Sequence, residues 1–371
     1  MRFHSAPRAH RLLFGLTLLV LLLADSRSVG QSRTPLGFAA RIEQLSEPGG
    51  YFDTDNLISN EKSYLHVIPA LGQLGVTGGA YIGVGPDQNF SYIARIKPAI
   101  AFIVDVRRDN MLLHLFFKAL FMMAETRAEY ICLLFGRAPP APADVWKEAE
   151  IDSLATYIDG LAASQTAALD TRVDAMLGTF GVPLSREDRK TIHDFHHRFI
   201  DAGLSLKFES KGRSPRSYYP TYRDLLLETD RQGHQWNFLA SEKNYHFLRS
   251  MQQQDLIIPV VGDLSGPTAL ASIAKFMLER GDQLSAFYAS NVEFYLFGDG
   301  TYSRFVENLA RFPRASHSVL IRSVFGRFTS IDTVPGYFST SLVEPIDHLV
   351  AGYSSSGYRS YYSLITAGRK R

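Results

Sequence analysis

The sequence is poor in cysteine and carries little net charge. A single cysteine, Cys132, excludes an intramolecular disulfide, so the fold must be stabilised by burial. With 46% hydrophobic residues, the chain can build a large core, in which we expect Cys132 to be a buried apolar side chain. The formal net charge is only +2, so we expect no nucleic-acid partner. The arginine- and tyrosine-rich stretch 211–223 is most simply a solvated loop broken by proline.

Long hydrophobic runs are absent except near the N-terminus. Residues 12–24 are uncharged and mainly apolar, and three arginines precede them. This stretch is too short to span a bilayer comfortably and is typical of a signal peptide, with cleavage expected near Gly30 and a mature start at Gln31. We therefore expect an exported protein, periplasmic or secreted. The alternative is a membrane anchor formed by an uncleaved N-terminal segment. Residues 1–30 carry a net charge of +3, which leaves −1 on the mature chain.

Two families of catalytic motif are also missing. No Gly-x-Ser-x-Gly pattern marks a lipase-like nucleophile. His193 and His197 stand four residues apart, a spacing at which two imidazoles on one helical face can share a zinc ion. However, the glutamate of a His-Glu-x-x-His protease is lacking, and no third ligand is evident. A polar helix facing solvent explains the pair more simply, and we expect no metal site.

Apolar runs alternate with amphipathic segments through much of the remaining chain. Helices are predicted over 88–97 and 268–280, the second ending at Gly281. This alternation predicts an α/β fold with a doubly wound, mostly parallel sheet. Residues 137–235 contain no convincing strand and are interpreted as a mainly helical insertion between two halves of one Rossmann-like domain, 31–136 and 236–371. The predicted strands lie near Ala80, Ala99, Leu256, Leu284, Ser318 and Tyr361.

A short pattern, Glu-Lys-x-Tyr, occurs twice before a predicted strand. The first copy begins at Glu61 and the second at Glu242. Three explanations are open: internal duplication of a site, a pattern that any repeated helix–strand unit would show, and chance. Glu242 is expected to act structurally at a helix N-terminus, where negative charge is favoured.

The stretch "YIGVGPDQNF", followed by "FIVDV", resembles the nucleotide-binding start of class I S-adenosylmethionine-dependent methyltransferases. In that family a glycine-rich turn after the first strand lets the backbone approach the cofactor, and an acid ending the second strand accepts both ribose hydroxyls. Two positions depart from the family pattern: Tyr81 stands where an acid is usual, and Asp87 replaces the third glycine. A nicotinamide-type Rossmann site is disfavoured because Gln88 occupies the place of a small residue.

The resemblance implies S-adenosylmethionine as the cofactor and a cleft at the carboxyl ends of the strands. Two functions follow from it. The first is an exported methyltransferase-like enzyme with an unidentified acceptor. The second is a non-catalytic exported protein that recognises a nucleoside-like or other small ligand in the same cleft. The implied cofactor-binding residues are Gly83, Gly85, Asp87, Asn89 and Asp105, and the implied catalytic residues are Asp263, Asn291 and Glu61. In methyltransferase-like folds the segment before the first strand often closes over the cofactor, so the resemblance also implies that Asn60, Glu61 and Tyr64 form a lid or wall of the ligand site.

Overall fold

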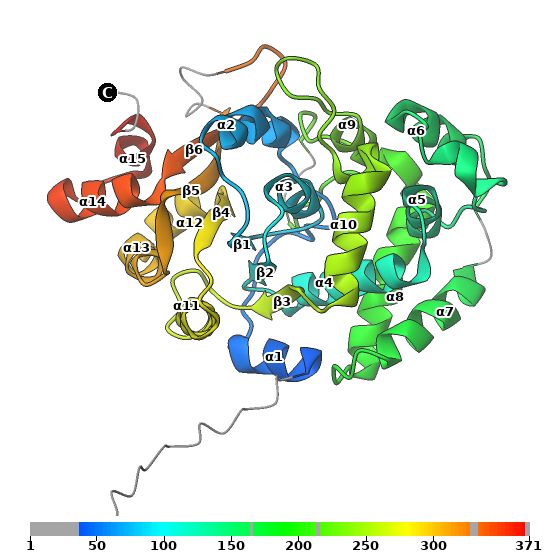
Figure 1. Cartoon of the computed structure of the whole chain (residues 1–371), viewed down its shortest axis with the longest axis horizontal. Helices are drawn as coiled ribbons and strands as arrows, with labels where there is room; N and C mark the ends of the chain where they lie inside the picture. Colours follow the sequence, from blue (N-terminus) through cyan, green and yellow to red (C-terminus); the bar gives the residue numbers. More distant parts are fainter. Residues whose placement is uncertain (1–36, 164–165, 213–215, 327–332, 368–371) are drawn as a thin grey trace, which may run out of the picture. The chain divides into compact units, whose positions relative to one another are not determined.

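The computed structural model describes residues 37–163, 166–212, 216–326 and 333–367. Its centre is a six-stranded sheet with the order β3-β2-β1-β4-β5-β6 (Figure 1). The first five strands are parallel, and β6 runs antiparallel to β5. The protein is therefore of the mixed α/β class with a mostly parallel sheet. The strands are β1 Ala80–Gly83, β2 Ile100–Asp105, β3 Ile257–Val261, β4 Leu284–Ser290, β5 Arg314–Phe325 and β6 Ser339–Pro345.

Helices lie on both faces of this sheet. Figure 1 shows α3, α4 and α10 on one side and α11, α13 and α14 on the other. The central strands β2, β1 and β4 are consequently buried along nearly their whole length, as in parallel sheets generally. The α-helices are α1 Phe38–Leu45, α2 Ile68–Gln73, α3 Gln88–Ile96, α4 Arg108–Met123, α5 Arg127–Leu134, α6 Ile151–Asp159, α7 Thr166–Gly178, α8 Arg186–Ala202, α9 Tyr222–Leu226, α10 Glu242–Gln253, α11 Ala269–Arg280, α12 Val292–Gly298, α13 Tyr302–Ala310, α14 Ile346–Ser356 and α15 Tyr361–Ala367.

Local sequence explains how several helices begin and end. Lys97 ends α3 in a left-handed conformation, directly before Pro98, which cannot continue a helix. Gly281 ends α11 with φ +74°, a conformation that glycine adopts without strain. At the start of α8, Ser185 and Asp188 form a reciprocal capping box that satisfies two backbone amides.

The prediction of a last strand near Tyr361 is wrong. That residue begins α15, and Tyr361, Leu364 and Ile365 are buried on one helical face. Ser360 and Ser363 exchange hydrogen bonds at the start of this helix and so favour it over a strand. The sixth strand is β6, which carries Ser339, Thr340 and Ser341 in its first half, a polar composition that hides a strand from pattern analysis.

The segment between the two groups of strands contains α6, α7 and α8. They pack against α4 and α5 of the sheet layer. Within the described residues, no helix has the length and apolar character needed to cross a bilayer. The predicted signal peptide, residues 1–30, lies outside the described residues.

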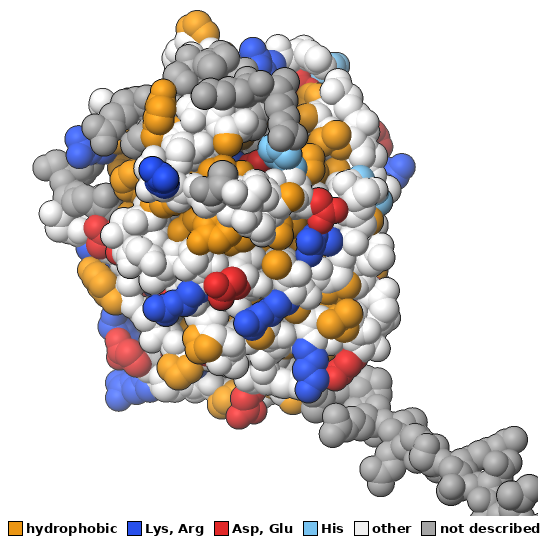
Figure 2. Space-filling view, turned by 90° about the vertical axis from the view of Figure 1, so that its left-hand side faces the viewer, with side chains coloured by type: hydrophobic (Ala, Val, Ile, Leu, Met, Phe, Trp, Pro, Cys, Tyr) orange, Lys and Arg blue, Asp and Glu red, His pale blue; other side chains and the backbone are white. Residues whose placement is uncertain are grey.

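The face on the left of Figure 1 carries hydrophobic surface. Figure 2 shows hydrophobic side chains gathered near the centre of this face, with acidic and basic side chains around them. Two of the later helices each carry an exposed ring: Phe294 of α12 is 43% exposed and Tyr362 of α15 is 57% exposed. Phe294 also packs edge-on against Tyr361, with 5.6 Å between the ring centroids. These helices thus cover the core while leaving some aromatic surface in contact with solvent.

Candidate functional site

A cavity of about 270 Å³ lies at the carboxyl ends of β1, β2, β3 and β4. In open α/β sheets this edge, beside the point where the strand order reverses, is where ligands bind. Residues from the turn after β1 form one wall, and the ends of the three neighbouring strands form others. Residues of the segments 51–60 and 292–301 and two aromatic side chains, Phe208 and Tyr219, complete it.

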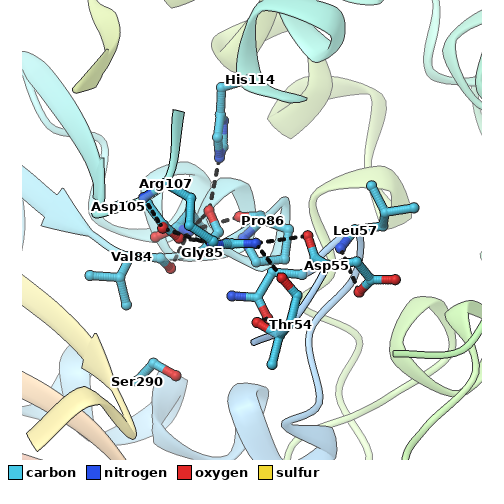
Figure 3. Close-up of polar contacts among 12 residues, drawn as sticks. Thr54, Asp55, Leu57, Val84, Gly85, Pro86, Asp105, Arg107, His114 and Ser290 are labelled. Atoms are coloured by element: carbon cyan, nitrogen blue, oxygen red, sulfur yellow. Dashed lines mark hydrogen bonds and ion pairs between the residues drawn. The ribbon is translucent and has the colours of Figure 1, made fainter. Parts of the chain in front are cut away.

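The turn after β1 is held in shape from the protein interior. Gly85 has φ +81° and lines the cavity. The Asn89 side-chain amide donates to the carbonyl oxygens of Val84, Gly85 and Pro86 at 2.9, 3.3 and 2.7 Å. His114 Nε2 donates to the Gly85 oxygen at 2.9 Å, as Figure 3 shows. Burial lowers the pKa of His114 to about 4, so at neutral pH this ring is an uncharged hydrogen-bond donor.

Gly83 and Asn89 therefore support the turn and do not line the cavity. A side chain at Gly83 would collide with the Asn89 oxygen, which accepts the Tyr81 hydroxyl at 2.8 Å. Tyr81, which stands where the family usually has an acid, thus helps to hold Asn89 and with it the turn. Of the three turn positions Gly83, Gly85 and Asn89, the structure brings only Gly85 to the cavity wall.

Asp105 lines the cavity, but most of its carboxylate is already in use. Arg107 donates to it from the backbone amide (2.9 Å), from Nε (3.1 Å) and from Nη2 (2.8 Å). Arg107 Nη1 also donates to the carbonyl oxygens of Thr54 and Asp55, at 2.8 and 3.0 Å (Figure 3). A carboxylate has about four lone-pair sites, so roughly one remains on Asp105 Oδ2. Asp105 can therefore accept one ligand hydroxyl, whereas the predicted grip on two hydroxyls would require Arg107 to move.

Asp263 and Asn291 also line the cavity, after β3 and β4 respectively. Asp263 Oδ1 accepts the amide and the hydroxyl of Ser265, at 2.8 and 2.9 Å. Within the described residues, Asp263 Oδ2 and Asn291 Nδ2 have no partner. The structure thus brings Gly85, Asp105, Asp263 and Asn291 together around one space and leaves hydrogen-bonding atoms available on the last two.

Asp87 lies behind the wall. It is 6% exposed, and its Oδ2 accepts the Tyr222 hydroxyl of α9 at 2.9 Å. Burial raises the pKa of Asp87 to about 6. This residue therefore connects the glycine turn to α9 and does not face the cavity.

Glu61 is fully buried and reaches the cavity only through another side chain. Its carboxylate accepts hydrogen bonds from the hydroxyls of Tyr288 (2.5 Å), Ser290 and Ser323. Ser290 lines the cavity, and no described Lys, Arg or His pairs with Glu61. Burial raises the pKa of Glu61. Of the three residues expected to form a lid or wall, Asn60 lines the cavity while Glu61 and Tyr64 do not.

The cavity wall is acidic and aromatic. Among the described residues that line it, three are aspartates and none is Lys, Arg or His. Phe52 and Tyr295 meet edge to face, with 4.8 Å between their ring centroids. Such walls favour a ligand with an apolar or aromatic body and positive or hydrogen-bond-donating groups, and they oppose a phosphate. The lining aspartates are Asp105, Asp263 and Asp299.

The other candidate chemistries lie elsewhere. His193 and His197 face aspartates of α7. The distance from His193 Nε2 to Asp174 Oδ2 is 3.2 Å, and that from His197 Nε2 to Asp170 Oδ2 is 2.9 Å. The described parts of the chain contain no group of three or more side chains arranged to hold a metal. Cys132 is buried, and burial raises the pKa of its thiol to about 12, which keeps it protonated.

Pattern analysis did not single out Arg107 or the aromatic wall. Arg107 lies two residues after Asp105, and that spacing alone does not show that the two side chains pair. Tyr51, Phe52 and Tyr295 belong to no motif and reach the cavity only through the fold.

Fold and site together define a mixed α/β protein with a ligand-sized cavity at the strand ends. Comparison with known proteins places the chain in a family described as a domain of unknown function (DUF7790), whose model matches residues 56–150 and 197–368. The unmatched residues between these ranges contain α6, α7 and the first part of α8. No curated protein matches the chain.

Proposed function

We propose that this protein is an exported, methyltransferase-like protein that binds S-adenosylmethionine, or a related nucleoside without phosphates, in the strand-end cavity. The observation that carries the proposal is the cavity itself: it combines a left-handed glycine turn, an acid ending the second strand, and a wall with three aspartates and no cation among its described residues. The acceptor of a methyl group stays open.

The strand order of the sheet supports the proposal of a nucleoside ligand. Its order, 3-2-1-4-5-6, is that of doubly wound dinucleotide-binding sheets, in which the crevice lies where the order reverses beside the first strand. Here that point falls between β1 and β4, and residues following both strands line the cavity.

The charge of the cavity wall favours a nucleoside without phosphates over a nucleotide. S-adenosylmethionine carries a sulfonium, an ammonium and a carboxylate group, with a net charge of about +1, and no phosphate, so its two positive groups suit a wall that contains aspartates. Gly85 would allow close backbone approach, Asp105 would accept one ribose hydroxyl, and Asp263 or Asn291 would orient the acceptor. When bound, this cofactor supplies the methyl group for transfer.

A second function, recognition of a small ligand without turnover, is favoured by one specific observation. Asp105 is already held by Arg107 through three hydrogen bonds, so the acid that would grip both ribose hydroxyls is largely occupied. A protein that only recognises a ligand in this cavity would not need a carboxylate that accepts both ribose hydroxyls.

Titration calorimetry of the protein tests the proposal. We expect S-adenosylmethionine and S-adenosylhomocysteine to bind, and adenosine triphosphate to bind far more weakly because its phosphates meet the aspartates. Asp105→Asn should weaken binding about tenfold or more through loss of one charge-assisted hydrogen bond. Asp109→Asn, four residues further on and not in the cavity wall, is the matched control. Absence of binding at millimolar ligand, or tighter binding of adenosine triphosphate, would refute the proposal.

A further inference from the structure

Ser290 has an unusual backbone at a sharp turn. It ends β4, and α12 begins two residues later. Its φ is +53°, a left-handed value that few residues other than glycine adopt. Residues held in such conformations cluster at functional sites, where the surrounding structure maintains them. Ser290 also lines the cavity, and Figure 3 shows it at the end of its strand, on the far side of the turn from His114.

The Ser290 hydroxyl donates to the carboxylate of Glu61. That carboxylate is in turn fixed by the hydroxyls of Tyr288 and Ser323, so the acceptor has a defined orientation. An activated nucleophile requires this arrangement: a hydroxyl within hydrogen-bond reach of a base, and a further group that orients the base. Burial of Glu61 without a described cationic partner raises its pKa and makes its carboxylate a stronger base.

A sharp turn from strand to helix that exposes a serine at the top of a sheet is also the geometry of nucleophilic serines in α/β hydrolases, although this chain lacks their glycine pattern. Asn291, the next residue, lines the cavity, and its Nδ2 has no partner within the described residues. An amide donor at this place can stabilise the oxyanion that develops in acyl transfer.

We propose that Ser290 is a nucleophile and Glu61 its general base, and that the cavity hydrolyses small carboxylic esters that are neutral or positively charged. The assignment goes beyond the function proposed above and does not rest on it. Neutral or cationic substrates follow from Asp263 and Asp299 of the wall, which have no cationic partner among the described residues, whereas Asp105 is paired with Arg107. The two unpaired carboxylates also repel the carboxylate product and favour its release.

The reaction proceeds in two balanced steps. Ser290 Oγ bonds to the acyl carbon and its proton passes to Glu61; the bond from that carbon to the alcohol oxygen then breaks, and the alcohol leaves with the proton. Water next attacks the acyl carbon and gives a proton to Glu61. The bond to Ser290 breaks, the carboxylic acid departs, and the proton returns to Oγ. No oxidant, metal or further reactant enters either step.

Labelling with a fluorophosphonate ester tests the assignment, because this probe phosphonylates activated serines with loss of fluoride. We expect intact-mass spectrometry of the protein to show a single adduct and peptide mapping to place it on Ser290. The labelling rate and the hydrolysis of p-nitrophenyl acetate should fall by about 100-fold or more in Ser290→Ala and Glu61→Gln, the usual size of a general-base contribution.

Two matched variants control for unspecific effects. Ser285→Ala removes a serine at the opposite end of the same strand, where its hydroxyl donates to the Gly78 oxygen at 2.7 Å, and should label like the wild type. Glu242→Gln changes the corresponding glutamate of the second Glu-Lys-x-Tyr copy and should also leave labelling unchanged. A wild-type protein without an adduct on Ser290 overturns the proposal whatever the variants do. An adduct on Ser265 instead, or undiminished labelling of folded Glu61→Gln, overturns it as well.

Discussion

The two Glu-Lys-x-Tyr copies share a pattern but have very different surroundings. In the first copy, Glu61 immediately precedes a 3₁₀ helix, Lys62–Val67, and its carboxylate accepts only hydroxyl groups. In the second, Glu242 begins α10 and lies 3.4 Å from the guanidinium of Arg127, with His246 3.3 Å away on its other side. One glutamate is thus buried without a described cation, and the other forms an ion pair.

The difference shows that a short shared pattern does not fix the chemistry of its residues. Both tyrosines are buried in the core, so the pattern has a common packing role. The glutamates diverge because the first faces the carboxyl edge of the sheet, near the cavity, and the second faces α5. The expectation that Glu242 acts mainly through the helix N-terminus is therefore incomplete, since its partner Arg127 is itself buried.

The largest effect should come from truncating the two glutamates. Glu61→Ala leaves the buried hydroxyls of Tyr288 and Ser323, and that of Ser290 at the cavity wall, without their acceptor and should cost about 3 kcal/mol or more of unfolding free energy. Glu242→Ala should cost about 1–2 kcal/mol, because Arg127 keeps its hydrogen bond to the Leu239 oxygen at 2.7 Å. Urea unfolding followed by circular dichroism measures both. Equal losses would favour a genuine duplication of the site. Glu61→Gln, which retains an acceptor oxygen, is the control that should stay within about 1 kcal/mol of the wild type.

Asp87 offers a third buried carboxylate, with one hydroxyl donor where Glu61 has three. Its pKa is raised from 3.8 to about 6, so the fold favours the protonated form. The protonated Asp87 carboxyl contributes its full stabilisation of the fold below about pH 4. This contribution, about 3 kcal/mol of unfolding free energy for a shift of this size, is lost as the pH rises through 6. The unfolding free energy of the wild type should therefore fall relative to Asp87→Asn between pH 4 and 7. A difference that stays constant over this range would mean that Asp87 titrates normally.

Removing the hydroxyl of each tyrosine sharpens the comparison further. The Tyr64 hydroxyl donates to the Leu225 oxygen at 2.9 Å and accepts the Asn237 amide at 3.0 Å. Tyr64→Phe leaves both groups buried without this partner and should cost about 2 kcal/mol. The Tyr245 hydroxyl donates only to the Ala124 oxygen, which Arg249 Nε also reaches at 2.8 Å. Tyr245→Phe should therefore cost about 1 kcal/mol or less in thermal unfolding. The reverse order would show that the second copy is the more tightly bonded one.

The smallest effect is expected at the two lysines. Lys62 Nζ lies 5.2 Å from the centroid of the Tyr337 ring, a cation–π contact. Lys62→Met should lose about 0.5–1 kcal/mol. Lys243 is exposed and has no ion pair or ring contact among the described residues, so Lys243→Met should change stability by less than about 0.5 kcal/mol. Chemical unfolding of both variants in one buffer checks this, and a larger loss at Lys243 would contradict the contacts described.

Much of the sheet could be predicted because its parallel strands are buried on both faces and therefore appear as continuous apolar runs. The predicted positions near Ala80, Ala99, Leu256, Leu284 and Ser318 fall at or next to β1 to β5. The sequence does not predict β6, because its hydroxyl-bearing residues resemble a loop. The predicted strand near Tyr361 is wrong because a short aromatic run fits either a strand or a helix.

The position of the candidate site follows from the sequence, but the orientation of several of its side chains does not. Gly85, Asp105, Asp263 and Asn291 follow strands, and parallel strands end at one edge, so their approach follows from the order of elements. Asp87 and Glu61 are acids near the same edge, and nothing in their local sequence shows that they point inward. Only the packing of α9 against the turn, and of β5 against β4, places hydroxyls around them.

The sequence by itself determined the α/β class, the helical segment between the strands and the edge at which the cavity lies, because periodicity and strand order are properties of short segments. Tertiary structure decided which polar groups meet. Glu61 contacts Tyr288, Ser290 and Ser323, which are 227, 229 and 262 residues away along the chain. Such contacts form only when distant strands align, and burial there removes the water that would otherwise solvate the carboxylate, so the partners set its charge and its chemistry.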